Sequence, residues 1–259
     1  GLMKRMRRSL IDQANDRGLS GVYGEAVTVH DISQRVNHHF GMMSTALLLG
    51  LFPSQRFRAL FDERTQPISV IIDFRPLVPY TTVTAHLPAR YADLLRRIYD
   101  ALGVHDLQVP PRSDTTTREQ WPDATEMDAR IRYSYNHVVF VVDRPGQDLS
   151  EQVNRALTDL EDDSMTVAFV DLPLDDPATP AATEILCEND FVLAGLMPRF
   201  HGNRDYLRLQ RPLTRLDPNG IEVYSDLAVD LKAHILNELS WTSNGMETRS
   251  RSASGATST

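Results

Sequence analysis

The 259-residue sequence contains a single cysteine, Cys187. One cysteine cannot form an internal disulfide, which fits a reducing compartment. The sequence also lacks an apolar run long enough to span a bilayer, and it lacks a secretory leader. We therefore expect a cytoplasmic protein with no membrane partner.

Basic residues are also in deficit, with 27 Lys and Arg against 35 Asp and Glu and a formal net charge of -8. A general nucleic-acid binder needs an excess of basic side chains to neutralise phosphates, so we expect no nucleic-acid partner. The only adjacent histidines, His38 and His39, point to different faces of a predicted helix and lack a Cys or carboxylate at ligand spacing. We expect no metal ion.

What the sequence does contain is a repeated order of elements. Patterning predicts, in each copy, a helix, an apolar strand, a short helix and a second strand. Gly50 and Pro53, near the end of the first copy, correspond to Gly195 and Pro198 in the second at the same offset. The predicted ranges are 2–16, 21–29, 31–40 and a strand ending at 48–53 in the first copy, then 149–160, 165–170, 177–187 and 191–198 in the second.

This repeat predicts an α/β protein made of two copies of one domain, with mixed sheets flanked by helices and an incomplete first copy. We expect the second half of a first domain at residues 1–78, a second domain at 79–241, and a disordered tail at 242–259 with almost nothing apolar. Because the chain starts at Gly1 with an amphipathic helix, we expect that a preceding segment has been removed. Further predicted elements are a strand at 81–87, a helix at 91–102, a strand or hairpin at 130–143, a strand at 206–210 and a helix at 227–239.

Candidate functional residues gather around the strand at 21–29, which is apolar enough to be covered on both faces. Ligands of open α/β sheets bind beyond the carboxyl ends of strands, which is where His30, Ser33 and Gln34 fall. His30 is either a proton-transfer group or a polar residue bonded to a nearby loop. Glu25 lies inside the strand, so it either pairs with a neighbouring Arg or faces a cavity.

The two helices that begin the copies differ in charge at their starts. The basic residues of the first helix form either a solvated face or an attraction for a phosphate-bearing ligand, since Gly1 leaves free backbone N–H groups. The turn before the second helix carries Asp143 and Asp148 and a single glycine, Gly146. Negative charge disfavours phosphate binding there. We therefore expect the second copy to be the less functional one.

Three short stretches resemble the second half of the GNAT acyltransferase fold: Gly1-Leu2-Met3 at a helix start, the strand that ends at His30, and Phe40-Gly41-Met42, which is similar to that superfamily's Leu-Gly-Phe step. More narrowly, residues 24–30 with Ser33 and Gln34, together with residues 206–210, are similar to bacterial tandem GNAT-like proteins. The resemblance covers about residues 1–240 in the order of elements.

The resemblance implies a tandem GNAT-like fold and an N-acetyltransferase that moves an acetyl group from acetyl-CoA to an amine on a small molecule or a protein. It implies that backbone N–H groups at the first helix bind the pyrophosphate, while the pantetheine lies along the strand at 21–29. The reaction needs a base for the amine and an acid for the thiolate, and the catalytic candidates are His30 and Glu25. The residues implied for acyl-CoA binding are Gly1, Leu2, Met3, Val27, Val29, Ser33 and Gln34.

A second interpretation is a non-catalytic GNAT-like module that binds a ligand or another protein. Many GNAT enzymes carry a tyrosine acid four residues before the glycine of the Leu-Gly-Phe step, and this chain has Asn37 there. An amide cannot deliver a proton to a thiolate. The sequence leaves open the acceptor and the oligomeric state, a homo-oligomer included.

Overall fold

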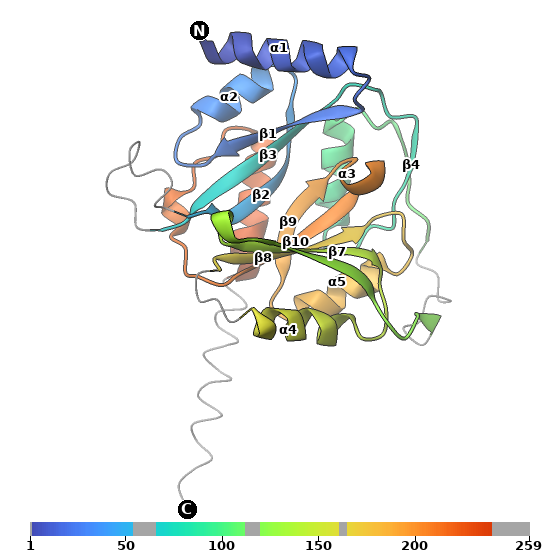
Figure 1. Cartoon of the computed structure of the whole chain (residues 1–259). Coiled ribbons are helices and arrows are strands. Elements are labelled where there is room, and N and C mark those ends of the chain that lie inside the picture. The colour runs from blue at the N-terminus through green and yellow to red at the C-terminus, as the bar shows by residue number, and fades with distance from the viewer. Residues whose placement is uncertain (1, 54–65, 112–119, 161–164, 240–259) are drawn as a thin grey trace, which may run out of the picture.

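The structure is a computed structural model that describes residues 2–53, 66–111, 120–160 and 165–239 (Figure 1). The helices are α1 Leu2–Asp16, α2 Ile32–His39, α3 Ala92–Ala101, α4 Leu149–Asp159, α5 Thr179–Cys187 and a last helix at 226–239, with short 3₁₀ turns η3 Tyr133–Tyr135, η4 His201–Asn203 and η5 Pro218–Gly220. The strands are β1 Gly21–Val27, β2 Met43–Phe52, β3 Ile68–Pro76, β4 Thr82–Thr84, β5 Asp106–Gln108, β6 Glu126–Arg132, β7 His137–Arg144, β8 Val167–Pro173, β9 Val192–Met197 and β10 Tyr206–Pro212.

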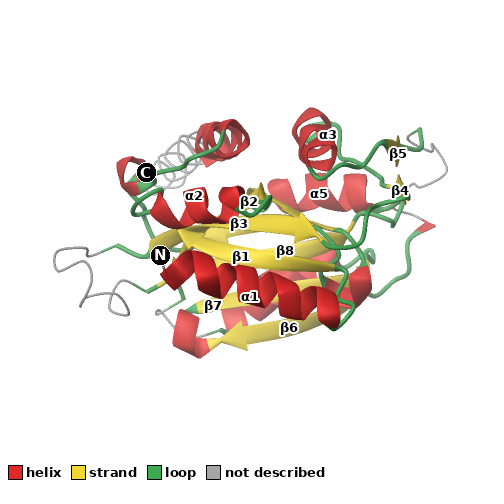
Figure 2. Ribbon diagram, turned by 90° about the horizontal axis from the view of Figure 1, so that it is seen from above, coloured by secondary structure: helices red, strands yellow, loops and turns green. Residues whose placement is uncertain are grey.

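Eight strands form one mixed sheet in the order β1-β3-β2-β9-β10-β8-β7-β6, and β4 and β5 form a small parallel pair apart from it. Within the large sheet β7 and β8 are parallel, and the other neighbours are antiparallel. Helices flank the sheet (Figure 2). The predicted α/β class with a mixed, helix-flanked sheet is confirmed.

The predicted repeat is present in the order of elements and in the pairing of strands. The series α1-β1-α2-β2-β3 recurs as α4-β8-α5-β9-β10. In the sheet, β1-β3-β2 and β8-β10-β9 have the same internal order and run outward from a shared β2–β9 boundary. The two series are therefore related as halves of one sheet, and α1 and α4 lie at its opposite ends (Figure 1).

The predicted match of Gly50 with Gly195 stays a prediction when it is compared with the pairing register. Both central hairpins carry a bulge, between Ser44 and Ala46 in β2 and opposite Arg208 and Leu209 in β10. Ala46 pairs directly with Gly195 across the boundary. β2 has a second register shift, between Leu48 and Phe52, and Gly50 lies inside it. Two shifts in β2 against one in the β9–β10 pair do not fix which residue of β2 corresponds to Gly195.

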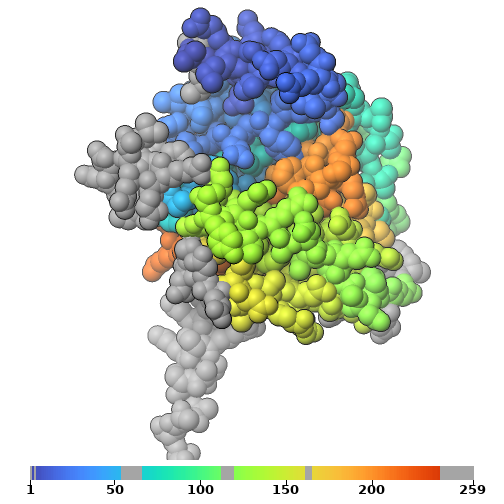
Figure 3. Space-filling view, viewed as in Figure 1, coloured from blue at the N-terminus to red at the C-terminus, as the bar shows by residue number. Residues whose placement is uncertain are grey.

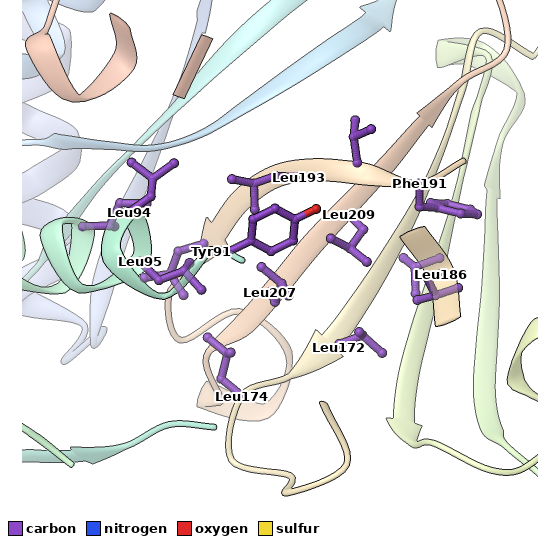
Figure 4. Packing of buried hydrophobic residues seen from close by; sticks show 14 of the residues in the cluster. Tyr91, Leu94, Leu95, Leu172, Leu174, Leu186, Phe191, Leu193, Leu207 and Leu209 are labelled. Atoms are coloured by element: carbon purple, nitrogen blue, oxygen red, sulfur yellow. The ribbon is translucent and has the colours of Figure 1, made fainter. Parts of the chain in front are cut away.

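The helix-covered face of the sheet carries the larger apolar core. α3, α5 and the helix at 226–239 pack on strand residues of both halves, and Figure 4 shows Tyr91 among leucines from helices α3 and α5 and from strands β8, β9 and β10. The other face holds a smaller cluster whose members all belong to strands, including Leu48, Ile72 and Met197. Because each fully buried Leu or Phe contributes roughly 1.5–3 kcal/mol, the continuous larger core ties the two halves together.

β1 is at one end of the described sheet and pairs only with β3 there. The sequence predicted that this strand was covered on both faces, and this is wrong for one of them, because Glu25 is exposed while Gly24 and Ala26 are buried. The alternation means that β1 buries the side toward α2 and presents Tyr23 and Glu25 on the other side. An ionised Glu25 therefore needs no buried partner.

The predicted domain boundary at residues 78–79 lies in the connection between β3 and β4. Arg199 holds this connection: its Nη1 donates to the carbonyl oxygen of Val78 at 2.7 Å, and its guanidinium lies 3.9 Å from the ring centroid of Tyr80. The division into domains stays a prediction, since strands from both predicted domains share one sheet.

Several predicted elements differ in extent. The strand predicted at 81–87 is only Thr82–Thr84, and the strand or hairpin at 130–143 is the hairpin of β6 and β7. The last helix, predicted at 227–239, covers 226–239. The predicted disordered tail at 242–259 lies outside the described residues. Among the described helices, none combines the length and apolar character needed to cross a membrane.

Candidate functional site

A cavity of about 560 Å³ opens on the face of the sheet that carries the smaller apolar cluster. Residues of β6 and β7 form one side of the cavity. In Figure 3 these strands are green, and the residues that follow β9, which are orange, lie next to them. Its floor is apolar and its rim is polar. The lining residues are Tyr23, Glu25, Leu48, Leu51, Phe52, Ile72, Arg130, Arg132, Ser134, Tyr135, His137, Val139, Met197, Phe200, His201 and Arg208.

A buried ion pair forms one wall of the cavity. Arg208 of β10 donates from Nε and Nη2 to the two carboxylate oxygens of Asp171 of β8 at 2.6 and 2.7 Å. Asp171 is fully buried and Arg208 is 5% exposed. Burial raises the pKa of Asp171, but the charge and hydrogen bonds of Arg208, together with those of His201, outweigh it, so the net pKa lies below the ordinary range. The carboxylate therefore remains ionised in its buried position.

His201 connects this ion pair to the cavity. Its Nε2 lies 3.1 Å from Asp171 Oδ2, and its Nδ1 lies 3.0 Å from Nη1 of Arg130. Because an arginine can only donate, Nδ1 acts as the acceptor and Nε2 carries the proton that it donates to Asp171. With this assignment Asp171 orients the ring through Nε2, and Nδ1 is the nitrogen that faces Arg130 at the cavity wall.

Two other cavity residues have shifted pKa values. Burial raises the pKa of Tyr23 well above its ordinary value, and its hydroxyl donates to the carbonyl oxygen of Pro198. Burial lowers the pKa of His137 to about 4. Both groups are consequently neutral near pH 7.

Together these groups can accept a proton inside a partly enclosed, largely apolar space. A histidine whose other ring nitrogen is held by a buried carboxylate is the arrangement that lets imidazole act as a general base, since the carboxylate also stabilises the imidazolium that forms. Glu25 lines the same cavity, and it belongs to β1 in the other half of the sheet. The cavity can therefore bind a small molecule and take a proton from it.

Of the predicted catalytic pair, the structure places only Glu25 in this cavity. His30 lies beyond the end of β1, at the start of α2, and has other interactions there. β1 alternates its side chains between the two faces of the sheet, so proximity in sequence did not bring His30 and Glu25 to one site.

The predicted acyl-CoA residues follow β1 and α1 instead. Gln34 is fully buried, and its side chain bonds backbone groups of Glu222 at 2.9 Å and Tyr224 at 2.9 Å. Its amide is thus occupied in holding the segment after η5, which contradicts a free binding role. Ser33 is the second residue of α2 and is partly buried.

The remaining residues of that set lie along one edge. Val27 ends β1 and is half-buried, while Val29 is buried beyond it. Leu2 is exposed at the start of α1, which Figure 1 places beside α2. Met3 is the second residue of that helix, and Gly1 lies outside the described residues. The start of α1 and the outer edge of β1 therefore belong to the same end of the sheet, away from the cavity floor.

Asn37, at the position of the tyrosine acid implied by the resemblance, faces away from the cavity. It is fully buried, and its Nδ2 donates to Oδ2 of Asp73 at 2.8 Å. Ser44 donates to the other oxygen of the same carboxylate at 2.7 Å. Asn37 thus belongs to a buried polar network between α2 and β3.

In the second half of the sheet, neighbouring backbone occupies the space at the turn before α4. A Cβ atom on Gly146 would lie 2.3 Å from the backbone carbon of Ala124. The backbone N–H of Gly146 donates to Thr125 Oγ1 at 2.9 Å, and the N–H of Thr125 donates to Asp148 Oδ1 at 2.7 Å. This turn has no room for a phosphate.

The sequence analysis missed His201, Arg130 and the Asp171–Arg208 pair. A signal for the pair was present in one strand: Asp171 interrupts an otherwise apolar run, where a charge is costly unless it is paired. No comparable signal marks His201, because it lies in a loop and its position depends on the packing of η4 against β8 and β10.

Among the described residues no group of three or more His, Cys, Asp or Glu side chains is placed to hold a metal ion. Comparison with protein families, with curated proteins and with solved structures gives no significant match to this chain.

Proposed function

We propose that the chain is an acyl-CoA-dependent N-acyltransferase that uses the cavity for its acceptor amine. The observation that carries the proposal is His201, which lines a cavity of about 560 Å³ with its Nε2 held by buried Asp171 and its Nδ1 accepting from Arg130. Deprotonating an ammonium group is the step for which acyl transfer to an amine needs such a base.

The order of elements supports the same proposal. The second unit has the sheet order β7-β8-β10-β9 with β7 and β8 parallel, and their pairing stops at Val141 and Asp171 although β7 continues to Arg144. A parallel pair whose pairing ends before the strand does is a feature of the fold that the GNAT resemblance implies. It supports the fold and not a donor site in this half, because the turn before α4 has no room for a phosphate.

In the proposed reaction the acceptor nitrogen attacks the thioester carbonyl carbon. The new C–N bond forms as the C–S bond breaks, and CoA leaves as a thiolate that takes up a proton. His201 accepts the proton of the acceptor ammonium at Nδ1, and the Asp171 carboxylate stabilises the imidazolium. Glu25 lies on the opposite wall, where its negative charge attracts the ammonium into the cavity.

For the donor, we propose the outer edge of β1 and the start of α1. The N–H groups of the first turn of a helix have no partners within the helix and favour an anion. Leu2 is exposed there. The residues that fit the donor are Leu2, Met3, Val27 and Val29, whereas Gln34 is engaged by backbone groups.

A non-catalytic binding module is the second candidate. The specific observation in its favour is that Asn37 and Gln34, two residues of the GNAT-like stretch, both serve buried structural contacts. Such a module would bind a ligand in the cavity without turnover.

Isothermal titration of the whole chain with acetyl-CoA separates the two candidates when it is combined with an assay for free thiol. The acyltransferase proposal predicts binding that free CoA competes for, and thiol release that depends on an added amine. Absence of both heat and thiol release with every amine tested would reject it in favour of the module.

A further inference from the structure

Two arginines stand side by side at the rim of the cavity. Arg130 and Arg132 are two positions apart in β6, so their side chains project to the same face of the strand, and both line the cavity. Asp128, the carboxylate that pairs with Arg130, is itself 59% exposed, and such exposed pairs contribute little. Within the described residues no ion pair holds Arg132. The third arginine, Arg208, is already neutralised by Asp171.

Arg130 also contacts Nδ1 of His201, the nitrogen proposed to act as the base. Its Nη1 lies 3.0 Å from His201 Nδ1, so the lone pair proposed to accept a proton is occupied by an arginine N–H. A carboxylate is a stronger acceptor for a guanidinium than a neutral imidazole is, because both partners are charged. A ligand carboxylate would therefore take this N–H and free Nδ1.

We propose that the acceptor is a free apolar α-amino acid, whose carboxylate binds Arg130 and Arg132 and whose amino group is then placed against His201. A carboxylate oxygen bound to Arg130 lies about 2.8 Å from its nitrogen. The α-amino group is one carbon away from the carboxylate, which keeps it within hydrogen-bond reach of Nδ1, about 3 Å. An amino group farther from the carboxylate would lie out of hydrogen-bond reach of His201 Nδ1.

The rest of the cavity fits an apolar side chain. Its floor consists of Leu48, Leu51, Ile72, Val139 and Met197. The volume of about 560 Å³ lies within the usual range for small-molecule sites and exceeds what an amino acid alone fills, which leaves room for the acyl group.

Acylation of the amino acid at this site depends on the proposed acyl transfer. His201 Nδ1 takes one proton from the ammonium, the nitrogen forms the C–N bond to the acyl carbon, and the C–S bond breaks. The second proton lost from nitrogen goes to the CoA thiolate, and the imidazolium returns its proton to solvent. The products are an N-acyl amino acid and free CoA, with no oxidant or reductant required.

The test uses L-leucine, L-methionine and L-phenylalanine as probes, with isoamylamine and 2-phenylethylamine as matched amines that lack the carboxylate. Binding to the whole chain is measured by titration calorimetry and by the side-chain ¹⁵N resonances of His201. At least one amino acid should bind and shift the Nδ1 resonance, and its matched amine should bind about tenfold more weakly or worse. If no amino acid binds, or if amino acid and amine bind equally, the proposal is wrong.

Variants separate the carboxylate contact from general effects on folding. Arg130→Gln should weaken amino-acid binding about tenfold or more and leave amine binding unchanged. The matched control is Arg96→Gln, which removes an exposed arginine of α3 that pairs only with Asp93 three residues away, and it should bind as the wild type does. Unchanged amino-acid binding by Arg130→Gln would overturn the proposal.

The binding result and the acyltransfer result are distinguishable. If amino acids bind in an Arg130-dependent way and no thiol is released from acetyl-CoA, the proposed function fails and the amino-acid site stands. If thiol is released with simple amines as fast as with amino acids, the function stands and the amino-acid site fails. His201→Gln should abolish thiol release while amino-acid binding persists.

Discussion

Ala46 of β2 and Gly195 of β9 face each other at the boundary between the two halves of the sheet, and theirs is the one registered pair joining β2 to β9 among the described residues. A Cβ atom on Gly195 would lie 2.3 Å from the carbonyl oxygen of Thr45 and 2.5 Å from Cα of Ala46. Gly195 also has a φ of +145°, which L side chains rarely adopt. Glycine is required here because the two backbones touch.

Gly195→Ala should therefore cost about 3 kcal/mol or more in the free energy of unfolding, because both the backbone contact and the dihedral angle resist a side chain. Gly103→Ala is the matched control, since Gly103 has a φ of +78° and open space around it, and it should cost about 1 kcal/mol. Chemical denaturation measures both. Equal losses in the two variants would contradict the close-contact explanation.

Gln210 completes the β2–β9 boundary with its side chain. Its amide nitrogen donates to the carbonyl oxygens of Leu47 at 3.0 Å and Leu193 at 2.9 Å, and its oxygen accepts from the N–H of Leu49 at 2.8 Å. Gln210→Met removes three hydrogen bonds and leaves buried backbone groups unpaired, so it should cost about 3 kcal/mol of stability. The exposed Gln13→Met on α1 should change the unfolding free energy by less than about 0.5 kcal/mol. A loss below 1 kcal/mol for Gln210→Met would show that other groups or water satisfy this boundary.

The Asp171–Arg208 pair gives a prediction about charge. Asp171→Asn leaves a buried guanidinium without its counter-charge and should destabilise the fold by about 3–5 kcal/mol, whereas the double change Asp171→Leu with Arg208→Met should recover much of that loss. Since the folded pKa of Asp171 is depressed, its stabilisation is present above the unfolded pKa of about 3.9 and is lost as pH falls through the lower folded value. Denaturation curves of the wild type, Asp171→Asn and the double variant at pH 7 test the predicted loss and recovery of stability. A double variant no more stable than Asp171→Asn would contradict it.

His137 gives a separate pH dependence at milder acidity. Its pKa falls from an unfolded value of about 6.5 to about 4 because burial disfavours the charged ring. The stabilisation is complete above the unfolded pKa and is lost as pH falls from about 6.5 toward 4, at about 1.4 kcal/mol per pKa unit. Denaturant titrations at pH 7 and pH 5 should therefore differ by more in the wild type than in His137→Gln. The exposed His105→Gln should keep the wild-type difference, and loss of the difference in both variants would point to another group.

The sequence predicted the repeated elements well because their signals are local. The helix Leu2–Asp16 matches its predicted bounds, and the strand, helix and strand that follow differ by a few residues at most. Apolar spacing and capping residues depend only on near neighbours, so they survive without tertiary information.

The candidate site could not be predicted in the same way, because it depends on which strands become neighbours. Glu25 was identified, but His30, three residues beyond the end of β1, does not line the cavity. His201, Arg130 and Asp171 come from η4, β6 and β8, and only the fold of the second unit brings them together.

The central claim is that the cavity holds an amine acceptor for acyl transfer with His201 as the base. Its most direct measurement is thiol release from acetyl-CoA by the wild type and by His201→Gln, each with and without L-leucine, L-methionine or L-phenylalanine. The account predicts amino-acid-dependent release in the wild type and loss of that release in the variant. Release that is unchanged in His201→Gln, or absent from the wild type with every amine tried, would contradict it.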